Sequence, residues 1–194
     1  MAKKRVAVLI SGRGSNMAAL IEAAKERSYP AEIALVVSNR PDAAGLARAE
    51  AHAIPTAVVD HRPYGKDRAA FERELQAVLD EHRVELVCLG GFMRLLTRDF
   101  VLHWEGRMLN IPPALLPSFP GLDPHGQALK AGVKISGATV HFVVPQADAG
   151  RSLRRQRCPY ATTIPPQRLL PVFSMSSIDC TRWRSGSWRR DASS

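Results

Sequence analysis

"RVAVLISGRGSNMAALIEAAKER", residues 5–27, decides the fold of this chain. The stretch begins with an apolar run and turns through two glycines, Gly12 and Gly14. Apolar residues then recur at helical spacing, and a second apolar run follows at 31–38. Apolar runs without polar alternation are typical of strands buried on both faces. The stretch therefore predicts a strand, a crossover helix and a second strand parallel to the first.

The same alternation of strands and helices continues to residue 144. Further strands are expected at 55–60, 84–91, 107–111 and 137–144, and helices at 15–27, 42–53, 66–83, 97–106 and 125–132. Repeated strand–helix units predict an α/β fold, a doubly wound and mostly parallel Rossmann-like sheet with helices on both faces. Ligands bind at the carboxyl ends of the strands in such sheets, so the loops that follow the strands are the candidate site.

The composition is that of a globular protein. The chain has 194 residues, of which 45% are hydrophobic, and no apolar run approaches the roughly 20 residues that a membrane helix needs. Cys88, Cys158 and Cys180 show no metal-ligand spacing and no disulfide framework. We therefore expect a cytoplasmic protein with no metal and no membrane partner.

The net charge of +9 is unevenly distributed along the chain. Residues 151–194 hold nine Arg, no Lys and two Asp, which leaves 18 basic and 16 acidic residues in 1–150. Because the first 150 residues are nearly neutral, the overall charge says little about what they bind. The near-neutral charge of residues 1–150 makes nucleic acid an unlikely partner for that part of the chain.

Residues 151–194 differ from the rest in pattern as well as in charge. They show neither a helical period nor strand alternation and are rich in Arg, Ser and Pro. We expect an α/β domain over 1–150 and an irregular tail, disordered or poorly packed, over 151–194. Inserting one base after the Gly150 codon would permit an apolar strand and an amphipathic helix. We hypothesise that the tail is a frameshift product, which resequencing of that codon tests.

Gly14, Ser15 and Asn16 lie where the first strand meets the first helix. A helix N-terminus offers unpaired N–H groups and a positive dipole end to an anion, and both side chains add donors. The spacing matches neither the dinucleotide-binding fingerprint nor a Walker loop. The turn predicts a phosphate site, and the alternative is an ordinary helix cap.

The segment after the strand at 84–91 is a candidate ligand slot. Gly90 and Gly91 permit close approach of the backbone, and Met93 and Leu95 provide apolar walls for a flat ligand. The alternative is that these side chains belong to the core.

Two ionisable residues lie at the last predicted strand. His141 lies within it, where a lone histidine is more often structural than catalytic. Asp148 follows in the small-residue loop "QADAG", where aspartate is commonly a turn residue.

Five motifs together resemble one family. "VLISGRGSN", "GFMRLL", "MLNIPPALLPSFPGL", "ATVHFV" and "DAG" have the order and spacing of phosphoribosylglycinamide formyltransferases over residues 4–150. Methionyl-tRNA formyltransferases would carry an "RGAAP"-like run where this chain has "SFPGLDPH". Formyltetrahydrofolate deformylases would carry an extra N-terminal domain.

The resemblance implies an enzyme of de novo purine (IMP) biosynthesis. Its members transfer a formyl group from the co-substrate 10-formyltetrahydrofolate to the amine of 5′-phosphoribosylglycinamide. By the same resemblance, the substrate phosphate binds Gly14, Ser15 and Asn16. The implied folate-binding residues are Arg68, Met93, Arg94, Leu95, Leu96 and Asn110.

The resemblance further implies that Asn110 and Asp148 are catalytic, with small molecules as partners and a monomer or homodimer as the assembly. The chain departs from the family at Pro112, where the family has its catalytic histidine. Proline has neither a side-chain donor nor an N–H, so we expect impaired activity. His125 is a neighbouring histidine that could bear on the site.

The second departure is the tail, which lacks the final strand and long helix of the family. Two alternatives therefore stay open. The chain could be a catalytically dead relative that binds phosphate or folate. It could also bind nucleic acid through its Arg-rich tail.

Overall fold

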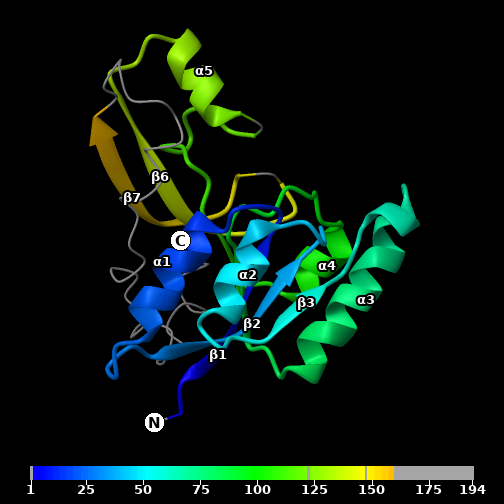
Figure 1. Cartoon of the computed structure of the whole chain (residues 1–194). Helices are drawn as coiled ribbons and strands as arrows, with labels where there is room; N and C mark the ends of the chain where they lie inside the picture. Colours follow the sequence, from blue (N-terminus) through cyan, green and yellow to red (C-terminus); the bar gives the residue numbers. More distant parts are fainter. Residues whose placement is uncertain (1, 122, 147, 160–194) are drawn as a thin grey trace, which may run out of the picture.

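A seven-stranded sheet runs through the computed structural model, which describes residues 2–121, 123–146 and 148–159 (Figure 1). The strands lie in the order β3-β2-β1-β4-β5-β6-β7. Their bounds are β1 Lys4–Ile10, β2 Ala31–Ser38, β3 Thr56–Val58, β4 Leu86–Leu89, β5 Met108–Asn110, β6 Ile135–Phe142 and β7 Ser152–Pro159. The strands from β1 to β5 pair in parallel, whereas β6 and β7 each pair antiparallel with the preceding strand.

The helices cover both faces of this sheet. They are α1 Ser15–Ala24, α2 Ala44–Glu50, α3 Arg68–Glu81, α4 Arg98–His103 and α5 Pro124–Lys130, with a 3-10 turn η1 at Arg62–Tyr64. Helices α1 and α2 pack on one face and α3 and α4 on the other, while α5 lies beyond the start of β6 (Figure 1). None of the described helices is long and apolar enough to cross a membrane.

β1 lies at the centre of the sheet and is buried on both faces, because successive side chains of a strand point to opposite sides. Val8 and Ile10 join the cluster beneath α1 and α2, whereas Ala7 and Leu9 join the cluster beneath α3 and α4. All four residues are 0% exposed. This two-sided burial explains the unbroken apolar run from which the strand is predicted.

The predicted fold class is confirmed. From β1 the chain moves outward to β2 and β3, and then returns to the other side of β1 to form β4 and β5. The direction of winding therefore reverses between β1 and β4, and the loops that follow these two strands separate at this point. Such a switch point leaves a crevice at the carboxyl ends of the strands.

The structure differs from the sequence-based expectation in the first part of the tail. An irregular chain is expected from residue 151, yet β7 pairs with β6 from His141↔Ser152 to Ile135↔Pro159. The physical reason is that ladder hydrogen bonds join backbone groups, which β6 offers to any extended neighbour. Leu153 also packs against the cluster beneath α1. The remaining predictions for residues 160–194 lie outside the described residues.

Candidate active site

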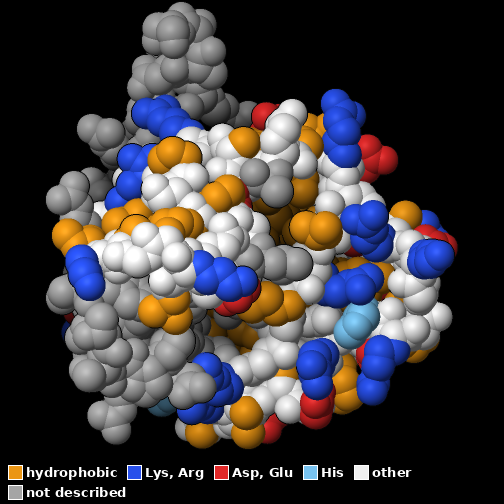
Figure 2. Space-filling view, turned by 90° about the horizontal axis from the view of Figure 1, so that it is seen from above, with side chains coloured by type: hydrophobic (Ala, Val, Ile, Leu, Met, Phe, Trp, Pro, Cys, Tyr) orange, Lys and Arg blue, Asp and Glu red, His pale blue; other side chains and the backbone are white. Residues whose placement is uncertain are grey.

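A cavity of about 240 Å³ opens at the switch point. Figure 2 shows the hollowed face, with apolar side chains lining the hollow and Lys and Arg side chains on either side of it. The loop after β1 contributes Ser11, Gly12, Arg13, Gly14, Ser15 and Asn16, and the other elements contribute Gly90, Gly91, Met93, Ile111, Pro113 and Ala138. Four strands and their loops therefore meet at one site, as expected for the carboxyl edge of such a sheet.

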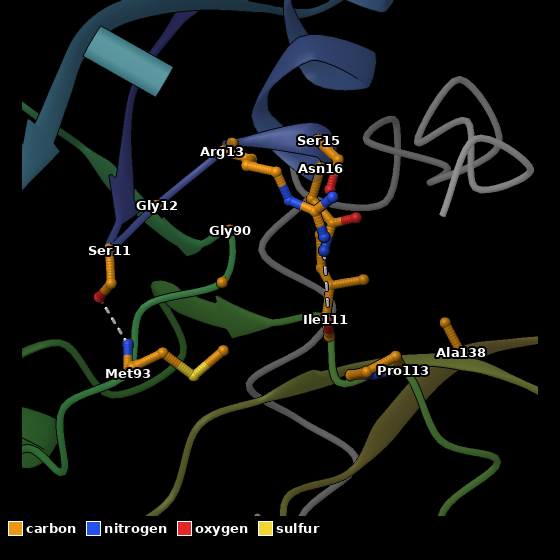
Figure 3. Close-up of a pocket in the computed structure, with 12 residues that line it drawn as sticks. Ser11, Gly12, Arg13, Ser15, Asn16, Gly90, Met93, Ile111, Pro113 and Ala138 are labelled. Atoms are coloured by element: carbon orange, nitrogen blue, oxygen red, sulfur yellow. Dashed lines mark hydrogen bonds between the residues drawn. The ribbon is translucent and has the colours of Figure 1, made fainter. Parts of the chain in front are cut away.

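The glycine turn, residues 12–16, adopts a conformation that suits its predicted role as a phosphate site. Gly14 has φ +66° and caps α1, and a Cβ there would lie 3.0 Å from the Met17 side chain and 3.3 Å from the Gly45 backbone. The first turn of α1 carries no acidic residue, so its N–H groups and dipole favour an anion. Asn16 Nδ2 donates to Ile111 O at 3.5 Å, which ties the turn to the loop after β5 (Figure 3).

Among the described residues that line this cavity, Arg13 is the one that carries a charge. Its side chain is exposed and extends toward the side where Asn16 and Ile111 lie (Figure 3). A flexible guanidinium beside a helix N-terminus adds a full positive charge to the positive end of the helix dipole at the same opening.

A buried polar network, which could not be identified from the sequence, fixes the Met93 loop, residues 90–96. The backbone N–H of Met93 donates to Ser11 Oγ at 2.7 Å (Figure 3). Ser11 Oγ in turn donates to Asn39 Oδ1 at 2.5 Å. Asn39 Nδ2 lies 3.0 Å from His61 Nδ1. Ser11 and Asn39 are 9% and 2% exposed. The sequence signal for Ser11 and Asn39 is that each follows directly after an apolar strand run, at the edge of the sheet where the loops meet.

The predicted folate-binding residues occupy different environments. Met93 lines the cavity and, like Leu95, is 73% exposed. Leu96 instead packs against the core cluster of α3 and α4, so it fits the alternative of a core residue. An exposed methionine and leucine side by side are unusual on a protein surface and suit an apolar ligand.

The two predicted arginines lie along the start of α3. Arg94 places its guanidinium 5.9 Å from the ring centroid of Phe71, in a cation–π contact. Arg68 is exposed at the first position of α3, about one turn before Phe71. The structure thus places Arg94 against α3, with Arg68 about one turn away along the same helix.

The loop after β5 is pinned to β6. Asn110 ends β5 opposite His141, and its Oδ1 accepts from Ile111 N at 2.9 Å. Pro112 O accepts from Thr139 N at 3.2 Å. Pro113 then lines the cavity. Position 112, where the sequence resemblance implies a catalytic histidine, is thus occupied by a half-buried proline on a fixed backbone.

Asp148 is held by backbone and side-chain groups from two elements. Its Oδ2 accepts from Gly121 N at 2.8 Å, and its Oδ1 lies 3.5 Å from His141 Nε2. The Asp148 side chain is 13% exposed, whereas that of His141 is 2% exposed. The structure thus brings Asp148 beside the buried histidine. His125 lies in the first turn of α5.

The resolved pKa shifts belong to ion pairs outside the cavity. The Arg62 side chain donates to Asp60 and lowers the pKa of that carboxyl to about 2. A hydrogen bond from Lys4 likewise lowers the pKa of Glu85. Within the described part of the chain, no three His, Cys, Asp or Glu side chains are grouped as metal ligands.

Comparison with known proteins places this geometry in a family. The formyl transferase model matches residues 4–168 and so extends through β7. Trifunctional purine biosynthetic protein adenosine-3 of Bos taurus is 51% identical over 157 residues, which cover 81% of this chain and 15% of that protein. The chain thus spans about one-seventh of that relative.

Single-function relatives match over a larger share of their length. Phosphoribosylglycinamide formyltransferase of Bacillus subtilis is 43% identical over 147 residues, covering 76% of this chain and 75% of that protein. The crystal structure of phosphoribosylglycinamide formyltransferase from Brucella melitensis superposes with a TM-score of 0.80 at 43% identity, over 87% of this chain and 88% of that one. With most of its length matched by the family model and its fold shared with these structures, the chain belongs to the formyl transferase family.

Proposed function

We propose that this chain descends from, and retains the binding site of, an enzyme that transfers a formyl group from 10-formyltetrahydrofolate to the amine of 5′-phosphoribosylglycinamide in purine biosynthesis. The observation that carries the proposal is the cavity, which joins an anion-binding turn to an apolar slot at the switch point. The names of the relatives at 43% identity supply the formyl group and its acceptor, phosphoribosylglycinamide. The donor 10-formyltetrahydrofolate follows from the sequence resemblance.

The glycine turn binds the substrate phosphate. Backbone N–H groups at the start of α1 meet the phosphate oxygens, and the side chains of Ser15 and Asn16 add donors. Because Asn16 also contacts Ile111 O, this turn is fixed relative to the loop that carries Asn110. The amine of a bound substrate is thereby directed toward the reacting region.

The Met93 loop binds the folate. Met93 and Leu95 offer exposed apolar surface for a flat pterin ring, with Arg94 beside them. Arg68 at the start of α3 provides a cation for the carboxylate groups of the folate. In this assignment Leu96 acts through the core, since it packs on the cluster of α3 and α4.

The chemistry falls to Asn110 and Asp148. When the amine attacks the formyl carbon, the carbonyl oxygen becomes an oxyanion, and the amide of Asn110 donates to it. Asp148 accepts the proton that the attacking nitrogen loses. The departing folate nitrogen takes up a proton as its bond to carbon breaks, and the oxyanion returns to a carbonyl.

Pro112 limits this reaction, because it removes a donor at the oxyanion and a proton carrier. Losing one such donor typically lowers the rate about 10²- to 10³-fold. The same substitution favours a second candidate function, a protein that binds phosphate or folate without turnover. Nucleic-acid binding is predicted from the Arg-rich tail 151–194, of which residues 160–194 lie outside the described residues.

Comparing Pro112→His with the parent chain in a formyl-transfer assay tests the proposal. We expect kcat to rise about 10²- to 10³-fold, since the imidazole restores a donor. Pro112→Ala is the matched control, because it relieves the stiffness of Pro112 without adding an imidazole. Equal kcat in all three chains would contradict the assigned role of position 112. Calorimetric binding of both substrates without turnover in any chain would support the second candidate.

A further inference from the structure

His141 Nε2 is a buried polar atom that lacks a hydrogen-bond partner among residues 2–121, 123–146 and 148–159. The residue lies near the carboxyl end of β6, between β5 and β7, and is 2% exposed. Buried polar side-chain atoms are normally paired, so an unpaired one requires an explanation. The neighbours of the two ring nitrogens provide it.

The first ring nitrogen must carry a hydrogen. His141 Nδ1 lies 2.9 Å from the backbone oxygen of Phe142. A carbonyl oxygen can only accept, so the contact requires an N–H at Nδ1. If the ring were neutral, Nε2 would then present a lone pair.

The second ring nitrogen faces another acceptor. Nε2 lies 3.5 Å from Asp148 Oδ1, a separation that leaves no room for a water molecule between them. A lone pair at Nε2 would repel an ionised carboxylate. The pair must therefore hold one more proton than a neutral imidazole and a carboxylate would.

The other oxygen of Asp148 indicates where this proton resides. Asp148 Oδ2 accepts from Gly121 N at 2.8 Å, and hydrogen bonds of this kind favour the ionised carboxyl. We infer that His141 is a protonated positioning residue, whose Nε2–H holds the Asp148 carboxylate in the geometry that the reaction needs.

This role gains importance from the substitution at position 112. The proposed family reaction uses an imidazole there, on the open side of the site, and Pro112 removes it. His141 is an imidazole that remains in direct reach of Asp148, from the buried side. It contacts no solvent-accessible reacting atom, so its effect passes through Asp148.

The consequence for catalysis rests on the proposed function. During formyl transfer, the neutral amine attacks the formyl carbon, Asp148 takes the proton that this nitrogen then loses, and Asp148 returns that proton to the departing folate nitrogen. His141 stays protonated throughout, so protons and charge balance around the cycle. Its contribution is to keep Asp148 Oδ1 oriented.

Nitrogen NMR of the intact chain labelled with ¹⁵N-histidine tests the inference without any turnover. The chain has six histidines, and the His141 signal is assigned as the one that changes in Asp148→Asn. At neutral pH we expect both ring nitrogens of His141 to carry protons in the parent chain, and the Nε2 proton to be lost in Asp148→Asn. A neutral ring in the parent chain overturns the inference, whichever nitrogen carries the hydrogen.

A pair of substitutions tests the effect on catalysis. His141→Gln can place an uncharged N–H near the Nε2 position, whereas His141→Asn reaches only the Nδ1 position. We expect kcat of the Pro112 chain to fall about 100-fold in His141→Asn and less in His141→Gln, with KM unchanged for both substrates. Unchanged kcat in His141→Asn overturns the role in catalysis. If no chain transfers a formyl group, the proposed function fails, while the NMR result still decides the protonation of His141.

Discussion

Thr139 anchors the loop that follows β5, and removing its hydroxyl tests this anchor directly. The residue is 0% exposed. Its Oγ1 donates to Ala114 O at 2.8 Å and accepts from Leu116 N at 3.0 Å. Thr139→Val keeps the shape of the side chain but removes both bonds, leaving two backbone groups in residues that are 1% and 4% exposed.

The expected loss follows from these two groups. An unsatisfied buried donor or acceptor costs about 1–3 kcal/mol, so leaving two should lower the free energy of unfolding by about 2–6 kcal/mol. The assay is urea denaturation at matched m-values, compared with the parent chain. Thr139→Ser is the control, because it keeps the hydroxyl and loses one methyl group, at a cost of about 1 kcal/mol.

Amide hydrogen exchange identifies the site of the effect. In Thr139→Val the N–H of Leu116 should exchange much faster, while amides in α3 keep their relative protection. A Thr139→Val chain within about 0.5 kcal/mol of the parent would refute the reasoning, since surface-like substitutions have effects of that size. So would a Thr139→Ser chain that is less stable than Thr139→Val.

Two further predictions concern binding and packing. Arg13→Gln should weaken calorimetric binding of a phosphate monoester about two- to fivefold, the scale of an exposed charge pair. Arg27→Gln, an equal charge change in the turn that follows α1, should have no effect, and equal losses would contradict a local role. In Gly150→Ala the added Cβ would lie 1.6 Å from Phe142 O, so the free energy of unfolding should fall about 1–3 kcal/mol. Gly12→Ala, which meets nothing within 4 Å, should stay within about 0.5 kcal/mol, and a reversed order in thermal melts would refute the contact.

The sheet could be predicted because its signals are local. Apolar runs at β1, β2 and β4 reflect burial on both faces, and the spacing of α1 and α3 reflects burial on one. β7 could not be predicted in this way, because its pairing with β6 is a property of two backbones and leaves little pattern in side chains. The observed strand ends differ from the predicted ones by up to two residues, because they too depend on backbone pairing.

The site shows the same division between local and tertiary signals. The turn at Gly14 could be predicted, since a glycine with positive φ at a helix start leaves a local trace. The link from Met93 through Ser11 to Asn39 joins segments far apart in sequence. A hydrogen bond of this kind depends on the register of β1 against β2, which composition does not specify. His141 likewise reads as structural until Asp148 is placed beside it.

In the proposed function, binding and chemistry are carried by different loops, and this separation bears on what Pro112 changes. Binding falls to the loops after β1 and β4, through backbone groups near Gly14 and the apolar surface of Met93. Chemistry falls to the loops after β5 and β6. Pro112 alters only the second pair, and its carbonyl is still bonded to Thr139 N, so the backbone near Asn110 stays anchored. A change that removes a transition-state donor and spares ground-state contacts lowers kcat with little effect on KM. Substrate affinity should therefore persist in a chain whose turnover is low, and a KM that shifts as much as kcat on Pro112→His would show that the two functions are not separate.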